Sequence, residues 1–368
     1  MRSEAPRPSP GESESSARRR RRRRLACAVF LGGLLVAFAG AEAVARWRGL
    51  RPWREHPQHP ERAYHERDAE RGWRLRPGRY EVPPFSERGR PYRVTVLPGG
   101  RRWTGEPTGR RRPRLAVLGG SYTFGAGVDD GESYPARLQQ LLPSVEVDNY
   151  GVNGYGTVQC LATLRRVLRG ARPPRWVLYG FLAWHEERNV GSARWLAMLA
   201  WNGPGVSTPY ATLGPEGLRL HPPEAYRLWP LQRASALVNA VQQTVAARQT
   251  AQRVAQAAAV TVELVLQMNA LCRAQGVDFR VVFLLVPPER QRAYRSTFEA
   301  QGLRCIDANH PLGPAWSLPG DPHPNARLHA WYAERIADAL RDDLSRPTAG
   351  ASSAPDRRAP PQEEDRPR

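Results

Sequence analysis

The amino-acid sequence predicts an α/β fold with a parallel sheet, preceded by a transmembrane helix. Two observations indicate the fold. From Arg114 onward, short apolar runs alternate with helical patterns, and the almost unbroken apolar run from Asp278 to Val286 is typical of a central strand. A third observation indicates the membrane helix, because an uncharged apolar run begins at Leu25, directly after seven arginines.

Residues 1–24 are expected to form a disordered basic segment on the cytoplasmic side, ending in the run Arg18 to Arg24. Residues 25–45 follow as the predicted single-pass transmembrane helix, which is long enough to cross a bilayer. The arginines place its amino end in the cytoplasm, so the rest of the chain is expected on the exterior or periplasmic side of the cell membrane. A cleaved signal peptide is the alternative, because small-x-small sites occur at 37–39, 41–43 and 43–45.

The region that follows the span has little continuous apolar pattern. Residues 46–113 are rich in Arg, Pro and Gly, and we interpret them as a tether and an irregular prelude that packs on the main domain. Within them, Gly72 to Leu75 and Tyr92 to Val96 are short ordered candidates. The main domain is predicted over residues 114–343, and residues 344–368 are expected to be a disordered tail.

The composition indicates one catalytic domain with appendages. The formal charge is +20, and inspection of the sequence finds arginine at all 55 basic positions. No nucleic-acid recognition motif and no basic helix with interleaved aromatics is present in the folded part, so we expect no nucleic-acid partner. We interpret the positive charge instead as an attraction to anionic lipid or to an envelope polymer.

The main domain begins with the strand Leu115 to Leu118, and four further strands alternate with helices after it. The predicted helices begin at Ser133, Thr157, Leu231, Glu289 and Ala326; the later strands cover 145–149, 175–181, 278–286 and 303–306. Residues 190–230 interrupt this alternation with Trp, Gly and Pro. An insertion of that length beside a strand end is typical of a lid or of the wall of a binding pocket.

A serine follows the first of these strands. Leu115 to Leu118 runs into Gly119 and Gly120, and Ser121 comes next, which indicates a buried strand that ends in a sharp turn. The carboxyl ends of parallel strands are where open α/β sheets bind ligands. A serine at such a turn presents its hydroxyl there, and its own N–H can stabilise a developing oxyanion if a helix begins after it. The alternative is an ordinary turn.

A histidine with a nearby carboxylate lies about 200 residues later. His323 is flanked by prolines just before an amphipathic helix, and Asp321 precedes it by two positions. His323 could accept the proton of Ser121, while Asp321 fixes the tautomer of the imidazole and stabilises the imidazolium. Asp321 and Asn325 could equally cap the helix, and both roles are compatible.

These motifs resemble those of the SGNH or GDSL-type serine hydrolases, over roughly residues 70–343. The segments that carry the resemblance are Gly119-Gly-Ser-Tyr-Thr-Phe-Gly125, Asn149-Tyr-Gly-Val-Asn-Gly154 and Asp321-Pro-His-Pro-Asn325. The resemblance implies a flavodoxin-like three-layer α/β/α fold, with Ser121 as nucleophile and His323 as base. It also implies that Asp321 is the carboxylate partner and that the N–H groups of Ser121 and Gly154 form the oxyanion hole.

The chain departs from the family pattern at three places. Gly120 stands where the family has an aspartate, and Asp321 and His323 are closer in sequence than usual, in a form that carries a second histidine, matched by His329. The third departure concerns the oxyanion hole, because the family's asparagine falls on Trp184. Trp184 or His185 could donate in its place. Loss of one such donor typically costs about 3 kcal/mol of transition-state stabilisation.

The motifs predict a membrane-anchored serine esterase that cleaves carboxylic O-acyl esters of a small molecule or a glycan. An O-acyltransferase for envelope polysaccharide is one alternative, because a sugar hydroxyl could resolve the same acyl-enzyme. A non-catalytic carbohydrate-binding or accessory protein of the same fold is the other. The mechanism needs no cofactor and no metal. Three histidines of the tether, His56, His59 and His65, have a spacing that fits no ligand pattern.

Overall fold

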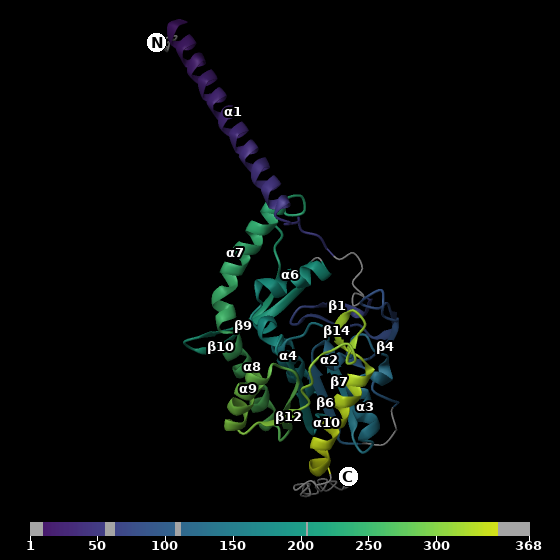
Figure 1. The fold of residues 1–368 in the computed structure, drawn as a ribbon. Helices are drawn as coiled ribbons and strands as arrows, with labels where there is room; N and C mark the ends of the chain where they lie inside the picture. The colour runs from purple at the N-terminus through teal and green to yellow at the C-terminus, as the bar shows by residue number, and fades with distance from the viewer. Residues whose placement is uncertain (1–9, 56–62, 107–111, 204, 345–368) are drawn as a thin grey trace, which may run out of the picture.

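The fold is centred on one eight-stranded mixed sheet with helices on both faces (Figure 1). The computed structural model describes residues 10–55, 63–106, 112–203 and 205–344. Residues 1–9 and 345–368, which belong to the two predicted disordered ends, lie outside the described residues. Two of the three tether histidines, His56 and His59, also lie outside them. The described part confirms the predicted α/β architecture and its apolar amino-terminal helix.

Five parallel strands form the half of the sheet that carries the motifs. In spatial order they are β12 (Arg304–Asp307), β11 (Asp278–Leu285), β8 (Trp176–Leu182), β6 (Arg114–Gly119) and β7 (Glu146–Gly151). The chain passes from β6 to its neighbour β7 and then crosses over to β8 on the other side of β6. The carboxyl end of β6 is therefore a topological switch point, where open α/β sheets form a crevice.

Two hydrophobic layers cover the sheet. On one face lie α4 (Thr157–Leu168), α8 (Ala257–Arg273) and α9 (Pro288–Ala300), and on the other lie α3 (Tyr134–Leu141) and α10 (Ala326–Leu344). The apolar side chains of α10 recur at helical spacing, and Leu328, Tyr332 and Ile336 are fully buried against the sheet. The result is the predicted α/β/α sandwich of three layers.

The segment before residue 114 contributes strands where the sequence predicted an irregular prelude. β3 (Gly78–Val82), β4 (Tyr92–Leu97) and β5 (Arg101–Arg102) extend the sheet beyond β7 in antiparallel register. A separate hairpin consists of β1 (His65–Asp68) and β2 (Gly72–Leu75). The two ordered candidates of the sequence coincide with β2 and β4. The other strands are too short to produce a periodic apolar pattern.

The insertion after β8 forms a small subassembly of its own. It contains α5 (His185–Asn189), α6 (Ala193–Asn202) and the hairpin of β9 (Ser207–Gly214) and β10 (Gly217–Ala225). α7 (Ala236–Ala255) follows and is bent by 52° relative to α8. The remaining elements are α2 (Ser121–Phe124), η2 (Asp130–Glu132), β13 (Ser317–Leu318) and β14 (Asp321–Pro324).

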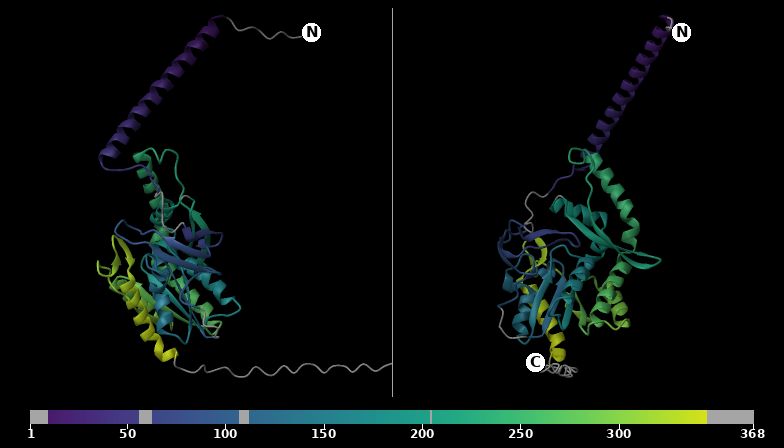
Figure 2. Two further views of the ribbon diagram at one scale, coloured as in Figure 1. Left: turned by 90° about the vertical axis from the view of Figure 1, so that its right-hand side faces the viewer. Right: turned by 180° about the vertical axis from the view of Figure 1, so that it is seen from behind.

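The amino-terminal helix α1 (Pro10–Trp47) projects away from the rest of the molecule (Figures 1 and 2). It is longer than the predicted span, because arginine is a good helix former and the run Arg18 to Arg24 continues the helix. The helix over residues 18–47 contains an apolar stretch that is long enough to cross a membrane, although a signal sequence has the same properties. The helix ends beside the amino end of α7.

Candidate active site

The Ser121 turn leaves the centre of the sheet at the switch point. β6 ends at Gly119, Gly120 has an extended backbone without a capping side chain, and Ser121 is the first residue of the short helix α2. The N–H groups in the first turn of a helix have no acceptor inside the helix. Ser121 is 3 % exposed, so its side chain is almost fully buried at this end of the sheet.

Contacts with β7 hold this turn against the sheet. The Asn149 amide donates to the carbonyls of Thr123 and Phe124 at 3.0 and 3.3 Å, and its oxygen accepts from the N–H of Gly151. A Cβ on Gly151 would lie 2.3 Å from the Phe124 nitrogen, so only glycine permits this approach. The Asn149 motif therefore fixes the position of α2.

The loop that follows β7 carries Gly154, the second predicted oxyanion donor. Gly154 has a φ of +79°, and a Cβ there would approach the Trp73 ring to 2.9 Å. The indole N–H of Trp73 donates to the Asn153 carbonyl at 3.0 Å, and the Tyr155 hydroxyl donates to the Trp73 carbonyl at 2.6 Å. A residue of β2 thus positions this loop, a role that nothing in the local pattern of the sequence indicates.

The predicted base and carboxylate lie together on β14. The Nδ1 atom of His323 is 2.6 Å from Oδ1 of Asp321, and the same oxygen accepts from the backbone N–H of His323 at 2.9 Å. The side chain of Asn325 accepts from the N–H groups of Arg327 and Leu328 at the start of α10. Asn325 is therefore the helix cap, and Asp321 orients His323.

Tyr122 connects the two halves of the motif across the crevice. Its hydroxyl donates to the Pro322 carbonyl at 2.7 Å, and its ring centroid is 5.8 Å from that of His323. Phe85 stacks on the other face of the imidazole at 5.1 Å. Within the described part of the chain the Ser121 hydroxyl forms no hydrogen bond. A direct bond to His323 is thus absent here, as is common before substrate binds.

His329, the second histidine of the motif, is not part of this crevice. It is fully buried on α10, and its Nδ1 atom accepts from the Tyr134 N–H at 3.2 Å. Burial and the nearby charge of Arg102 lower the pKa of His329 to about 3. It is therefore a neutral support for the start of α3.

The two candidates for the third oxyanion donor differ in accessibility. Trp184 is 43 % exposed and packs edge-on against the Tyr122 ring at 6.0 Å. His185 is fully buried, with Nδ1 2.7 Å from the Tyr179 hydroxyl and Nε2 without a hydrogen bond to any described residue. Burial and the charge of Arg188 hold the pKa of His185 well below its usual value.

A buried arginine that the sequence did not single out lies behind the Ser121 turn. A Cβ on Gly120 would lie 3.1 Å both from Nη1 of Arg188 and from Nε2 of His185. The same Nη1 atom donates to the Tyr155 carbonyl at 3.0 Å, and the guanidinium lies 4.6 Å from the centroid of the Trp195 ring. Arg188 therefore places a positive charge next to the nucleophile and supports the Gly154 loop.

Asn189, at the end of the same short helix α5, joins two of the helices that cover the sheet. Its side-chain oxygen accepts from the Thr157 N–H at 2.6 Å, and its amide donates to the hydroxyls of Thr157 and Thr261. Because Asn189 is fully buried and its polar atoms are bonded, it caps α4 and joins that helix to α8.

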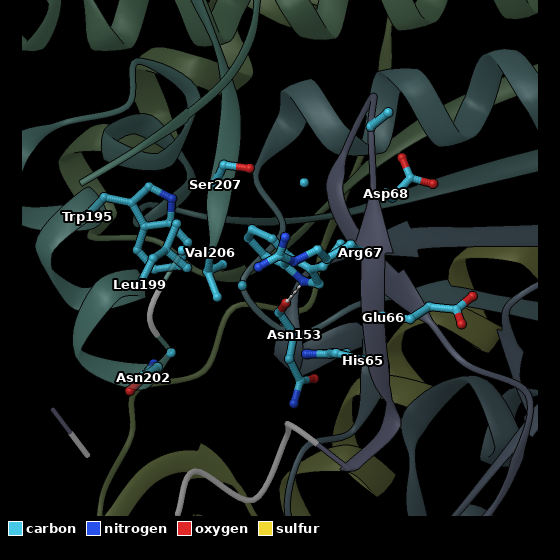
Figure 3. A pocket seen from close by; sticks show the side chains of 16 residues that line it. His65, Glu66, Arg67, Asp68, Asn153, Trp195, Leu199, Asn202, Val206 and Ser207 are labelled. Carbon is cyan, nitrogen blue, oxygen red and sulfur yellow. Dashed lines mark hydrogen bonds between the residues drawn. The ribbon is translucent and has the colours of Figure 1, made fainter. Parts of the chain in front are cut away.

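A cavity of about 710 Å³ opens beside Gly154 (Figure 3). Apolar side chains of the insertion, among them Trp195 and Leu199, lie on one side of it, and His65 and Arg67 from β1 lie on the other. Neither Ser121 nor His323 lines the cavity, whereas Asn153 and Gly154 of the loop after β7 do. The predicted insertion and the prelude together form its wall.

Comparisons with known proteins place hydrolases among the structural neighbours. No described protein family matches the chain by sequence, and no curated protein sequence matches it. A member of the lipolytic protein G-D-S-L family from Veillonella parvula DSM 2008 is 12 % identical, with 62 % of this chain and 98 % of that chain covered and a TM-score of 0.37.

Two esterases are similar to the same extent. The psychrotrophic esterase EstA from Pseudoalteromonas sp. is 13 % identical, with 63 % and 99 % covered and a TM-score of 0.36. The SGNH-hydrolase family esterase AlinE4 is 16 % identical, with 64 % and 96 % covered and a TM-score of 0.32. These neighbours are GDSL or SGNH hydrolases, the family that the motifs resemble. Identities and TM-scores this low transfer no activity to this chain.

Proposed function

We propose that this protein is an exported, membrane-anchored hydrolase that cleaves carboxylic O-acyl esters through an acyl-enzyme on Ser121. The observation that carries the proposal is the contact between Asp321 and His323, at 2.6 Å, on a turn that Tyr122 ties to the nucleophile. A lone serine in a turn would not need an oriented histidine across the crevice. The arrangement has the roles of a Ser-His-Asp triad.

The proposed reaction begins with proton transfer from the Ser121 hydroxyl to Nε2 of His323. The serine oxygen then attacks the ester carbonyl, and Asp321 stabilises the imidazolium through Nδ1. His323 returns the proton to the departing alcohol, which leaves an acyl group on Ser121. Water, activated by the same histidine, releases the acid and regenerates the enzyme.

The negative charge of the tetrahedral intermediate would be stabilised by the N–H groups of Ser121 and Gly154. Trp184 or His185 would supply the third donor, and the accessibility of Trp184 favours it, since the Nε2 atom of His185 is buried under the turn. The guanidinium of Arg188 lies next to Gly120 and would add a fixed positive field. A charge in a site with little water acts more strongly than it does in bulk solvent.

The cavity beside Gly154 would hold the larger part of the substrate. Two indoles, Trp73 and Trp195, and the aliphatic Leu199 line it, which suits an acyl chain or the face of a sugar ring. The apolar helix α1 would keep this site at the membrane surface. Transfer of the acyl group to a sugar hydroxyl in place of water remains the second candidate, and the same cavity favours it because it has room for an acceptor.

The proposal is tested by labelling the full-length protein with a fluorophosphonate, a reagent that reacts with activated serines. We expect labelling of the wild type and at least about a thousandfold slower labelling of Ser121→Ala and His323→Ala. His310→Ala, which removes a half-buried histidine outside the site, is the matched control and should label normally. A folded wild type that does not label would favour the non-catalytic binding protein.

Product analysis separates hydrolysis from transfer. The wild-type protein, not treated with fluorophosphonate, would be given a short-chain aryl ester with and without a soluble oligosaccharide. Free acid as the main product in both reactions is expected for a hydrolase. Acylated oligosaccharide as the main product would replace hydrolysis by transfer and leave the roles of Ser121 and His323 unchanged.

A further inference from the structure

The end of the apolar helix is clamped to the folded domain. Glu42 is the single acidic residue of the apolar stretch 25–45, and it lies at the amino end of α7. Its carboxylate accepts from the backbone N–H groups of Ala236 and Leu237, each at 2.9 Å, and from the Ser235 hydroxyl at 2.7 Å. The backbone N–H groups in the first turn of α7 have no acceptor inside the helix, and the Glu42 carboxylate supplies one. Figure 1 shows the two helices meeting at this point.

Residues just after α1 add further contacts. Arg46 donates to the Ala234 carbonyl at 2.8 Å, and the backbone N–H of Trp53 donates to the Gln232 carbonyl at 2.9 Å. The Trp53 ring stacks on Tyr226 with centroids 5.0 Å apart. The segment from Glu42 to Trp53, predicted in part as a tether, is therefore docked on the domain. The orientation of α1 relative to the domain is set by these contacts.

Exposed apolar side chains gather around this junction. Trp47 is 84 % exposed, Leu50 is 42 % exposed, and Trp229 and Leu231 are 40 % and 64 % exposed. We call these four residues the collar. Leu231 has a φ of +66°, the left-handed backbone conformation that residues other than glycine rarely adopt. The loop that carries Trp229 and Leu231 is the one bonded to Arg46 and Trp53, so the collar surrounds the end of α1.

Four exposed arginines lie near the junction. Arg48, Arg51, Arg54 and Arg227 are exposed, and none of them forms an ion pair within the described part of the chain. A helix rises about 1.5 Å per residue, so residues 25–45 cover roughly 31 Å, the thickness of the hydrocarbon core of a bilayer. The collar and these arginines therefore lie at the depth of the lipid headgroups, where tryptophan and arginine are favoured.

We propose that the collar is a second membrane-contact surface, which inserts into the headgroup region of an anionic phospholipid bilayer. By its hydrogen bonds to α7, Glu42 holds the collar at a fixed position relative to the membrane-spanning part of α1. The proposal rests on retention of α1, and it has a consequence for that question. Cleavage after Ala43 or Ala45 would remove Glu42 and expose the amino end of α7, whereas the docked contacts require that residues 42–47 stay attached.

The test places spin labels on the full-length protein in lipid nanodiscs made from a mixture of phosphatidylglycerol and phosphatidylcholine. Cys27→Ala and Cys305→Ser remove the two cysteines that are not fully buried. One label replaces Leu231 (Leu231→Cys), and its matched control replaces another exposed leucine, Leu141 (Leu141→Cys). Leu141 belongs to α3, a helix that lies far from α1 in Figure 1. Mass spectrometry of the reconstituted chain verifies that α1 is intact, so loss of the anchor cannot be mistaken for failure of the collar.

We expect the label at position 231 to be protected at least about fivefold from a water-soluble nickel relaxant and to be accessible to oxygen, as lipid-exposed sites are. The label at position 141 should be open to nickel. Equal nickel access at the two positions would overturn the proposal. Protection that persists in detergent and rises with protein concentration would also overturn it, because it would identify a second copy of the chain as the occupant.

Substitution of Glu42 tests the clamp. Glu42→Ala should raise hydrogen exchange at the amides of Ala236 and Leu237 by at least about tenfold and increase nickel access at position 231. Glu42→Gln, which keeps one acceptor, should have an intermediate effect. An unchanged exchange rate and unchanged nickel access in Glu42→Ala would refute the role of Glu42. Labelling of Ser121 by a fluorophosphonate is independent of these readouts, so failure here is distinct from failure of the esterase proposal.

Discussion

The candidate site has two halves that are built in different ways. The reacting half, with Ser121, Asp321 and His323, is formed by two turns, and the imidazole is partly open to solvent. The supporting half follows β8, and its polar members His185, Arg188 and Asn189 are almost completely buried. Ser121, Asp321 and His323 are the residue types that the SGNH pattern has at these positions. After β8 the pattern is not kept, because Trp184 stands where the family has an asparagine.

On the proposed mechanism, this difference explains how the oxyanion hole would work without the asparagine of the family pattern. In the supporting half, polar groups pack beneath the Ser121 turn instead of lining the crevice. Arg188 lies against Gly120 and holds the Gly154 loop by its bond to the Tyr155 carbonyl. Stabilisation of the intermediate would then depend on a fixed charge behind two backbone donors, with Trp184 at the rim.

Among substitutions in the two halves of the site, Arg188→Gln is expected to have the largest effect on kcat/KM. Glutamine can still donate to the Tyr155 carbonyl, but it removes the positive charge beside the nucleophile. We expect kcat/KM for an aryl ester to fall by about a hundredfold, the size of effect found when one element of an oxyanion hole is lost. Steady-state kinetics with a short-chain aryl ester measures it.

Two controls make the Arg188 result interpretable. Arg194→Gln changes an arginine of the same region whose side chain is 87 % exposed, and it should alter kcat/KM by less than about twofold. Thermal unfolding of Arg188→Gln shows whether the fold is intact. A folded variant with wild-type kcat/KM would mean that the supporting half contributes only packing.

A smaller effect is expected from Trp184→Phe. Phenylalanine keeps a ring against Tyr122, whose centroid is 6.0 Å from that of Trp184, but it has no N–H to donate. If the indole supplies the third donor, kcat should fall by about tenfold with little change in KM, because the donor acts on the transition state. The effect is smaller than for a buried donor because Trp184 is 43 % exposed and water screens its N–H. An unchanged kcat together with a reduced kcat in His185→Gln would transfer the donor role from Trp184 to His185.

The sequence predicts the reacting half well because its information is local. A strand that ends in Gly119-Gly120-Ser121 and a turn with Asp321 and His323 can each be recognised within a few residues. The supporting half and the membrane junction depend on contacts between distant segments. Trp73 holds Asn153, which is 80 residues away in the chain, and Glu42 caps a helix that begins 194 residues later.

The residues in those distant contacts carry no local signature. A tryptophan in an Arg-rich prelude and a glutamate in an apolar span each fit several ordinary roles, and only the fold selects one. Arg188 follows Trp184 closely in the sequence, but its burial beneath Gly120 results from the packing of α5 on the sheet. The fold class and the pairing of Asp321 with His323 could therefore be predicted, while the buried groups around them could not.

The buried histidines are expected to have the smallest effect at neutral pH. Their effect on the free energy of unfolding grows as the pH falls. The pKa of His329 is lowered to about 3 by burial and by the charges of Arg102, Arg137 and His323, whereas a histidine in the unfolded chain has a pKa near 6.5. Between these values the unfolded state binds the proton and the native state does not. The free energy of unfolding therefore falls as the pH is lowered from 6.5 towards 3.

His329→Gln isolates this contribution, because glutamine can accept the Tyr134 N–H but does not titrate. Between pH 7 and pH 5 the free energy of unfolding of the wild type should fall by about 2 kcal/mol more than that of the variant. Urea denaturation at the two pH values measures the difference. Parallel pH profiles would mean that His329 is protonated in the native state, and acid sensitivity would then have to come from His185, the buried histidine of the supporting half.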